Sequence, residues 1–138
     1  MRVRDMMQKD VITLQSDEPL INAVEATASE RIRHLPILEG ERLVGILSAT
    51  DIKHAVPSPL IEGNKEEYDR VLNTTPVSRV MRRQPLSVAP EASLAEVVRL
   101  MIENKVGAIL VVEDGRLVGI VSELDVLATF RKVLEILE

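Results

Sequence analysis

The residues best suited to chemistry in this chain form two Ser-x-x-Asp motifs, Ser48 with Asp51 and Ser122 with Asp125. A carboxylate can accept hydrogen bonds from both hydroxyls of a cis-diol, and a nearby serine hydroxyl can donate to a phosphate oxygen. At the start of a helix, a spacing of three residues places both side chains on one side, so each pair can face a single ligand. The same residue types are also common helix caps, and capping is therefore the alternative interpretation of both motifs.

The two motifs belong to an internal repeat with an offset of 74 residues. Residues 42–51 and 116–125 are identical at seven of ten positions, and the register continues without a gap from 6–52 against 80–126. Such a repeat predicts two copies of one supersecondary unit that share a core. We divide the chain into a first repeat (1–56), a connector (57–79) and a second repeat with a C-terminal helix (80–138).

Within the first copy the hydrophobic period changes in a fixed order. Residues 11–14 form a β-branched run, and residues 16–19 offer an N-cap and a proline for a helix that spans 20–32. Two strand-like runs, 35–38 and 43–47, are joined by a hairpin signal, and Asp51 opens a further helix. The pattern predicts an α/β fold of two βαββα repeats.

The second copy repeats this order. Ser93 is expected to cap a helix in a capping box with Glu96, and residues 113–115 supply the hairpin turn. In the connector, residues 65–72 predict a short charged helix. The apolar stripe of the last helix, from Val126 to Leu137, is too continuous for a helix surrounded by solvent, and it predicts a partner surface.

Composition excludes several classes of protein. A chain of 138 residues with 46% hydrophobic and 28% charged residues is typical of one globular domain. The net charge of −5 and the lack of a long basic run disfavour nucleic acid. No apolar stretch approaches the roughly 20 residues that cross a bilayer, and the N-terminus lacks the apolar core of a signal peptide, so we expect a cytoplasmic protein without membrane contact. The absence of cysteine excludes disulfides, thiol catalysis and thiolate metal sites.

Other chemistries find little support in the sequence. The two histidines, His34 and His54, fit neither a metal-ligand spacing nor a serine triad. Gly45 and Gly119 stand alone within strand-like runs, where close packing explains them, and no glycine-rich phosphate loop is present. We therefore expect no catalytic residues, no dedicated metal site and no enzymatic activity.

Several stretches together resemble the cystathionine β-synthase (CBS) domain. They are the Met-x-x-x-x-Ile-Thr opening that starts at Met7, the Arg-His-Leu-Pro-Ile stretch at 33–37 and the Gly-Ile-Leu-Ser-x-x-Asp-Ile close at 45–52. Two copies in register resemble a tandem CBS pair, also called a Bateman module, and the resemblance covers residues 3 to 127. It implies two repeats related by pseudo-two-fold symmetry, with two clefts between them. Such clefts bind AMP, ADP, ATP or S-adenosylmethionine, and the bound ligand regulates an attached or partner protein.

The resemblance also implies roles for particular residues. Asp51 and Asp125 would accept hydrogen bonds from the ribose hydroxyls, and Ser48 and Ser122 would bond the ribose or phosphate region. The adenine would be lined by strand residues and held between aliphatic side chains, because the only aromatic residues are Tyr68 and Phe130. The full expected ligand-binding set is Val11, Ile12, Thr13, Arg33, His34, Pro36, Ser48, Thr50, Asp51, Leu86, Ser87, Gly107, Ala108, Ser122 and Asp125.

The two clefts are expected to differ. The first copy carries Arg33 and His34 where the second has Gly107 and Ala108. Arginine binds phosphate with a bidentate fork, so we expect unequal affinity, with phosphate held chiefly by Arg33 and His34. A solvated strand end is the alternative for these two residues, and the small residues of the second copy would leave room for a ligand.

Two functions of different classes follow. The leading one is a regulatory module that senses an adenine nucleotide, with Mg²⁺ accompanying a polyphosphate, and signals to an unknown regulated protein. The alternative is a dimeric protein-interaction scaffold with empty or vestigial clefts. A homodimer is expected in both cases, because CBS pairs commonly associate into a disc of four CBS units that would cover the apolar helix faces.

Overall fold

The computed structural model describes residues 1–28, 32–56 and 64–138, which form two compact units. One unit consists of Ile12–Pro85 and contains the first Ser-x-x-Asp motif; we call it the Asp51 unit. The other combines Met1–Val11 with Leu86–Glu138 and contains the second motif; we call it the Asp125 unit.

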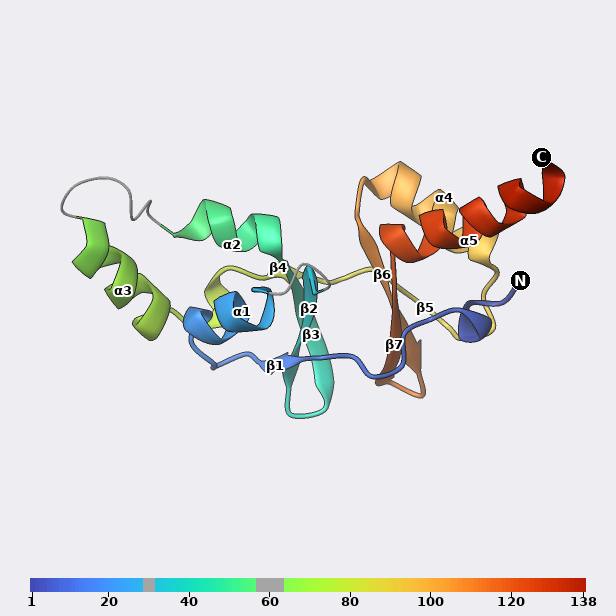
Figure 1. Cartoon of the computed structure of the whole chain (residues 1–138). Coiled ribbons are helices and arrows are strands. Elements are labelled where there is room, and N and C mark those ends of the chain that lie inside the picture. The colour runs from blue at the N-terminus through green and yellow to red at the C-terminus, as the bar shows by residue number, and fades with distance from the viewer. Residues whose placement is uncertain (29–31, 57–63) are drawn as a thin grey trace. The chain divides into compact units, whose positions relative to one another are not determined.

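The Asp51 unit is built on a four-stranded mixed sheet of order β1-β2-β3-β4 (Figure 1). Strand β1 pairs parallel with β2, whereas β2 with β3 and β3 with β4 pair antiparallel. Its elements are β1 (Leu14–Gln15), α1 (Leu20–Ala26), β2 (His34–Glu39), β3 (Arg42–Ser48), α2 (Ala49–Ala55), α3 (Asn64–Thr74), a 3₁₀ turn (Val77–Arg79) and β4 (Arg82–Arg83).

The Asp125 unit repeats this plan with a three-stranded sheet of order β5-β6-β7. Its elements are a 3₁₀ turn (Val3–Asp5), β5 (Ser87–Val88), α4 (Leu94–Asn104), β6 (Ala108–Glu113), β7 (Arg116–Ser122) and α5 (Glu123–Leu137). Gln8 forms a single antiparallel bridge with Ile120 of β7, which is the counterpart of the pairing of Arg82 with Ile46 in the other unit. The α/β class and the repeated βαββα order are thus confirmed.

The central hairpins follow the sequence pattern closely. The turn after β2 contains Gly40 at a φ of +64°, and the turn after β6 places Asp114 and Gly115 at φ values of +52° and +77°. The two consecutive residues in the left-handed region of the second turn are typical of the tight turns that match the twist of a hairpin. Both hairpins also carry a register irregularity at the same place, at Ile37/Leu38 and at Val111/Val112.

Alternate side chains of these strands form the cores. Leu35, Ile37 and Leu47 are fully buried with Leu20 of α1 in the Asp51 unit. In the Asp125 unit the same layer is made by Ile109, Val111, Val121 and Val97 of α4. The strand residues of the two sets stand at equivalent positions of the repeat, and each copy buries its own aliphatic core.

The core of each unit is completed by a short segment that lies directly before the other unit in the chain, and we call these two segments, Met1–Val11 and 77–85, the exchanged segments. Val3 is fully buried in the core of the Asp125 unit, and its amide donates to the Ala92 carbonyl at 2.9 Å. Val77 is fully buried in the Asp51 unit, and its amide donates to the Glu18 carbonyl at 2.8 Å. In Figure 1 the blue N-terminal segment runs beside β7, to which Gln8 is joined by its bridge with Ile120. The sequence pattern does not predict this exchange of segments.

The polar contacts of the N-terminal segment reinforce it. The Arg2 side chain donates from Nη1 to the Glu91 carbonyl at 2.6 Å, and Arg4 forms an ion pair with the Glu91 carboxylate. The Leu94 amide donates to the Met1 carbonyl at 3.0 Å, as the Leu20 amide does to Thr75 at 2.8 Å in the other unit. The N-terminal residues are therefore part of the fold of the second repeat.

Three predicted boundaries were wrong. The strand expected at 11–14 begins only at Leu14, because the parallel pairing with β2 starts there. Helix α1 ends at Ala26, and the Thr27 hydroxyl donates to the Ala23 carbonyl at 2.8 Å, so Ala28 and Ile32 lie outside the helix; residues 29–31 lie outside the described part. Pro19 occupies the N-cap position with extended backbone and lies outside the first turn.

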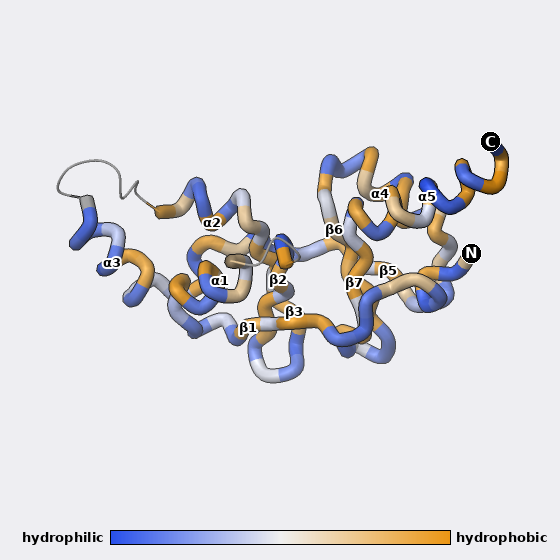
Figure 2. The backbone as a smooth tube through the Cα atoms, in the orientation of Figure 1, coloured by the Kyte–Doolittle hydropathy of each residue, from blue (hydrophilic) through white to orange (hydrophobic). Residues whose placement is uncertain are grey.

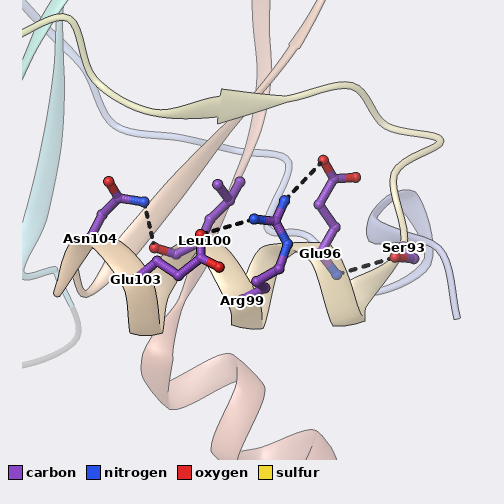
Figure 3. Close-up of polar contacts among 6 residues, drawn as sticks. All are labelled: Ser93, Glu96, Arg99, Leu100, Glu103 and Asn104. Atoms are coloured by element: carbon purple, nitrogen blue, oxygen red, sulfur yellow. Dashed lines mark hydrogen bonds and ion pairs between the residues drawn. The ribbon is translucent and has the colours of Figure 1, made fainter.

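Helix α4 contains the predicted cap but only half of the predicted capping box. Ser93 accepts a hydrogen bond from the Glu96 amide at 3.1 Å. The Glu96 carboxylate pairs with Arg99 at 4.0 Å, and Arg99 also donates to Glu103 at 2.9 Å (Figure 3). Glu96 therefore belongs to a chain of ion pairs on the exposed face of the helix. Charged pairs of this spacing stabilise a helix modestly.

The two other predicted helices are present. The charged helix of the connector is α3, and the C-terminal helix is α5. Apolar residues recur along α5 (Figure 2), and six of them are exposed: Leu124, Leu127, Phe130, Val133, Ile136 and Leu137. The expected apolar stripe is thus a feature of the surface.

Candidate functional site

The first motif lies where β3 passes into α2. Ser48 is the N-cap of α2, and its hydroxyl accepts from the Asp51 amide at 3.0 Å. In return, the Ser48 amide donates to Oδ2 of Asp51 at 3.0 Å, which completes a capping box. The Asp51 side chain is only 14% exposed. The motif thus fixes the direction in which the carboxylate points.

The second motif has the same geometry at the junction of β7 and α5. The Ser122 hydroxyl accepts from the Asp125 amide at 3.2 Å, and the Ser122 amide donates to Oδ2 of Asp125 at 2.9 Å. The capping interpretation is therefore correct for both motifs. Capping leaves both aspartates able to bind a ligand, because a carboxylate offers about four lone-pair positions and the capping hydrogen bond uses one.

Each motif carboxylate also contacts a side chain from the exchanged segment of its own unit. Arg82 donates from Nε to Oδ1 of Asp51 at 3.4 Å. Gln8 donates from Nε2 to Oδ1 and Oδ2 of Asp125 at 3.0 and 3.2 Å. Gln8 and Arg82 occupy equivalent positions of the repeat, each directly after a methionine. Because this contact recurs at equivalent positions, a donor side chain beside the aspartate is part of the candidate site in both units.

Gln8 and Arg82 are not among the site residues that the sequence predicts. A signal for them was present, since the offset of 74 residues aligns the two side chains and shows a cation in one copy against a neutral amide in the other. What the sequence lacked was the exchange of the preceding segments, which alone brings position 82 to Asp51 and position 8 to Asp125.

The first residues of the second strand of each copy lie next to the motif. His34 opens β2 opposite Ser48, and Ala108 opens β6 opposite Ser122. The carbonyl of Arg33 accepts from the Ala49 amide at 2.9 Å, and the carbonyl of Gly107 accepts from the Glu123 amide at 2.9 Å. The main chain of these predicted residues is thus joined to the helix that follows each motif.

The remaining predicted residues lie in several environments. In the Asp51 unit, Thr13 is half-buried, Ile12 and Thr50 are exposed, and Pro36 is fully buried in β2. In the Asp125 unit, Val11 and Leu86 are half-buried and Ser87 is exposed in β5. Ser87 pairs with Leu110 of β6, whereas its counterpart Thr13 lies one residue before the first pair between β1 and β2.

Outside the motifs, an ion pair in α3 shifts the pKa of a carboxylate. The Arg70 guanidinium donates a hydrogen bond to the Glu67 carboxylate in α3, which lowers the pKa of Glu67 from its ordinary value. No three acidic or histidine side chains of the described part gather as ligands for a metal ion. Among the same residues, none of the helices combines the length and hydrophobicity that a membrane span requires.

Comparison with known proteins places this architecture in a family. A CBS domain model matches residues 3–58 and again residues 77–132. The chain is 30% identical over 135 residues to a CBS domain-containing protein of Dictyostelium discoideum, covering 96% of this chain and 93% of the relative. Some other curated relatives are longer, and the chain spans 44% and 46% of two of them.

Two solved structures share the fold. A putative acetoin utilization protein (AcuB) from Vibrio cholerae superimposes with a TM-score of 0.79 at 32% identity, covering 98% of this chain and 93% of that one. The CBS domain pair of protein MJ0100 superimposes with a TM-score of 0.77 at 25% identity, covering 96% and 97% of the two chains. That pair was solved in complex with 5′-methylthioadenosine and S-adenosyl-L-methionine.

The fold and the repeated match define a tandem pair of CBS domains. The chain belongs to the CBS domain family and carries two CBS domains. CBS pairs are generally regulatory and not catalytic.

Proposed function

We propose that this protein is a non-catalytic regulatory module that binds adenine nucleotides or S-adenosylmethionine and signals its ligand state to a partner protein. The observation that carries the proposal is the recurrence of one arrangement in both units: a Ser-x-x-Asp capping box that leaves carboxylate lone pairs available. The adenosyl ligands of the MJ0100 pair support the same class of ligand.

In this proposal the motif aspartates bind the ribose. A carboxylate held by its own helix cap is oriented before a ligand arrives, so less conformational entropy is lost on binding. Ser48 and Ser122 would contact the ribose or phosphate region, with Thr50 nearby. Val11, Ile12, Thr13, Pro36, Leu86 and Ser87 would line the adenine, and Ile12 is accessible for this with 48% exposure.

Phosphate would be held differently by the two copies. Arg33 is exposed and charged, whereas its counterpart Gly107 has no side chain. Arg33 and His34 are proposed to bind phosphate in the first copy, and Gly107 and Ala108 to provide space in the second. Mg²⁺ would enter with a polyphosphate. The proposal also places the protein in the cytoplasm, where these ligands are made.

A homodimer is part of the proposal. Leu127 and Phe130 of α5 are 60% and 54% exposed, and Ile136 is 84% exposed. Apolar patches of this kind mark interaction surfaces, and a second copy of the chain would cover them. The same observation favours the second candidate function, a dimeric interaction scaffold whose ligand sites are vestigial.

Isothermal titration calorimetry tests the proposal. The purified protein, freed of bound ligand, is titrated with AMP, ADP, ATP and S-adenosylmethionine. We expect saturable binding that is weakened by Asp51→Ala or Asp125→Ala and unchanged by Asp17→Ala, an exposed aspartate outside the motifs. Circular dichroism verifies that each variant is folded. No binding of any of the four ligands by the native chain would favour the scaffold.

A further inference from the structure

The two motif carboxylates differ in the charge of their side-chain partner. Asp51 accepts from the guanidinium of Arg82, which places a positive charge beside this carboxylate. Asp125 accepts from the neutral amide of Gln8, so the charge of this carboxylate is not compensated by that partner. Because the two partners occupy equivalent positions, the difference is a property of the two copies of the site.

Neighbouring positions change the charge in the same direction. Ala49 follows Ser48, whereas the acidic Glu123 follows Ser122. Arg33, whose carbonyl is bonded to the Ala49 amide, is replaced by Gly107, whose carbonyl is bonded to the Glu123 amide. The cations at the position after Arg82 and Gln8, Arg83 and Lys9, are common to both copies. The copy at Asp51 is thus the more positive by several charges.

We infer that Arg82 and Gln8 are specificity-determining residues that give the two copies different ligand classes: a 5′-phosphorylated adenosine at Asp51, and an adenosine with an uncharged or cationic 5′ group at Asp125. The inference rests on the proposed function, since it assumes that both aspartates bind ribose.

The physical reason is the position of the variable group. Adenosyl ligands share the ribose diol and differ in charge at the 5′ carbon. That carbon lies within one sugar ring of the diol, well inside the Debye length of about 8 Å at physiological salt. A phosphate beside Asp125 meets a like charge whose side-chain partner is neutral, whereas beside Asp51 it meets a guanidinium with donors to spare.

Arg82 should also act as a competitor. Its side chain is 65% exposed and is free to leave Asp51. A phosphate gives the guanidinium a new partner when ribose takes its place on the carboxylate. A ligand with an uncharged 5′ group offers the guanidinium no new partner, so its binding breaks the ion pair between Arg82 and Asp51 without replacing it.

The test compares AMP with 5′-methylthioadenosine, which share adenosine but differ in 5′ charge. Each copy is isolated by disabling the other: Asp125→Ala leaves the Asp51 copy, and Asp51→Ala leaves the Asp125 copy. Kd values are measured by calorimetry at low and high salt with Arg82→Gln in the first background and Gln8→Arg in the second. The two substitutions exchange the residues of the equivalent positions.

Arg82→Gln is expected to weaken AMP binding at the Asp51 copy by about tenfold, which is the order of one hydrogen bond to a charged group. The same variant should bind 5′-methylthioadenosine as well as its background does, or better. Gln8→Arg is expected to shift the preference of the Asp125 copy toward AMP, and salt should reduce both effects. If both ligands bind but their affinity ratio is unchanged in both variants, the inference is wrong and the proposed function stands. If neither ligand binds the native chain, the proposed function itself fails.

Discussion

Gly45 of β3 lies so close to Met81 that a Cβ at position 45 would stand 2.4 Å from the Met81 sulfur. The Arg82 carbonyl would be 2.9 Å from the same Cβ. The counterpart Gly119 has the same relation to Met7, at 2.6 Å, and to the Gln8 carbonyl, at 3.0 Å. These two glycines therefore let the exchanged segment approach the sheet, and the segment carries the side chain that reaches the motif aspartate.

Gly45→Ala should accordingly affect stability and the site together. The added methyl overpacks the contact, and we expect a loss of about 1–3 kcal/mol in the free energy of unfolding. Arg82 should be displaced from Asp51 because its own backbone must shift. Chemical denaturation measures the first effect, and the AMP affinity of the Asp51 copy measures the second.

Gly40→Ala is the control: it strains a turn with φ of +64°, but its Cβ would meet no neighbour within 4 Å. A change in AMP affinity that is equal in both variants would contradict the proposed coupling.

Removing the cap hydroxyls should separate capping from binding. Ser48→Ala, Ser122→Ala and Ser93→Ala each remove an acceptor for a helix amide, and each should cost about 1 kcal/mol of stability. Ser93 lies outside the predicted ligand set, so only the first two variants should also weaken nucleotide binding. Thermal unfolding and calorimetry on the same samples provide the comparison. Equal binding by all three variants would leave the motif serines with a capping role alone.

The exchanged segments should be indispensable to the units they complete. Val3→Ala and Val77→Ala each remove two methyl groups from a fully buried position, and we expect a loss of about 1.5–2.5 kcal/mol in each case. Val11→Ala, at a half-buried position, is the matched control and should cost less. Urea denaturation measures all three. If Val3→Ala has no more effect than the control, the N-terminal segment is not part of the core in solution.

Phe130→Glu should abolish the proposed dimer without loss of fold. Phe130 is exposed, so the charge does not enter the core, but it would be buried in an interface that covers α5. Lys132→Glu, two residues away on the opposite face of the helix, is the control and should remain dimeric. Light scattering after size-exclusion chromatography measures the mass. A native chain that is monomeric at every concentration would remove the dimer from the proposal.

Much of the fold could be predicted because its signals are local or repeated. The hairpin turns depend on Gly40 and on the pair Asp114 and Gly115, whose backbone freedom is a property of the residue type. The position of Ser93 as a cap follows from the same local chemistry. The predicted end of α1 and the predicted start of β1 were wrong. The start of β1 depends on its pairing with β2 and the end of α1 on packing, and the hydrophobic period of the sequence reports neither.

By itself, the sequence determined the βαββα order, the two motifs and the resemblance to CBS pairs, because periodicity, turn chemistry and the offset of 74 residues are all written along the chain. Only the tertiary structure decided which side chain stands beside each motif carboxylate. Arg82 is 31 residues from Asp51 and Gln8 is 117 residues from Asp125. Contacts between residues so distant along the chain arise from how the exchanged segments pack onto each sheet, and local sequence patterns carry no information about that packing.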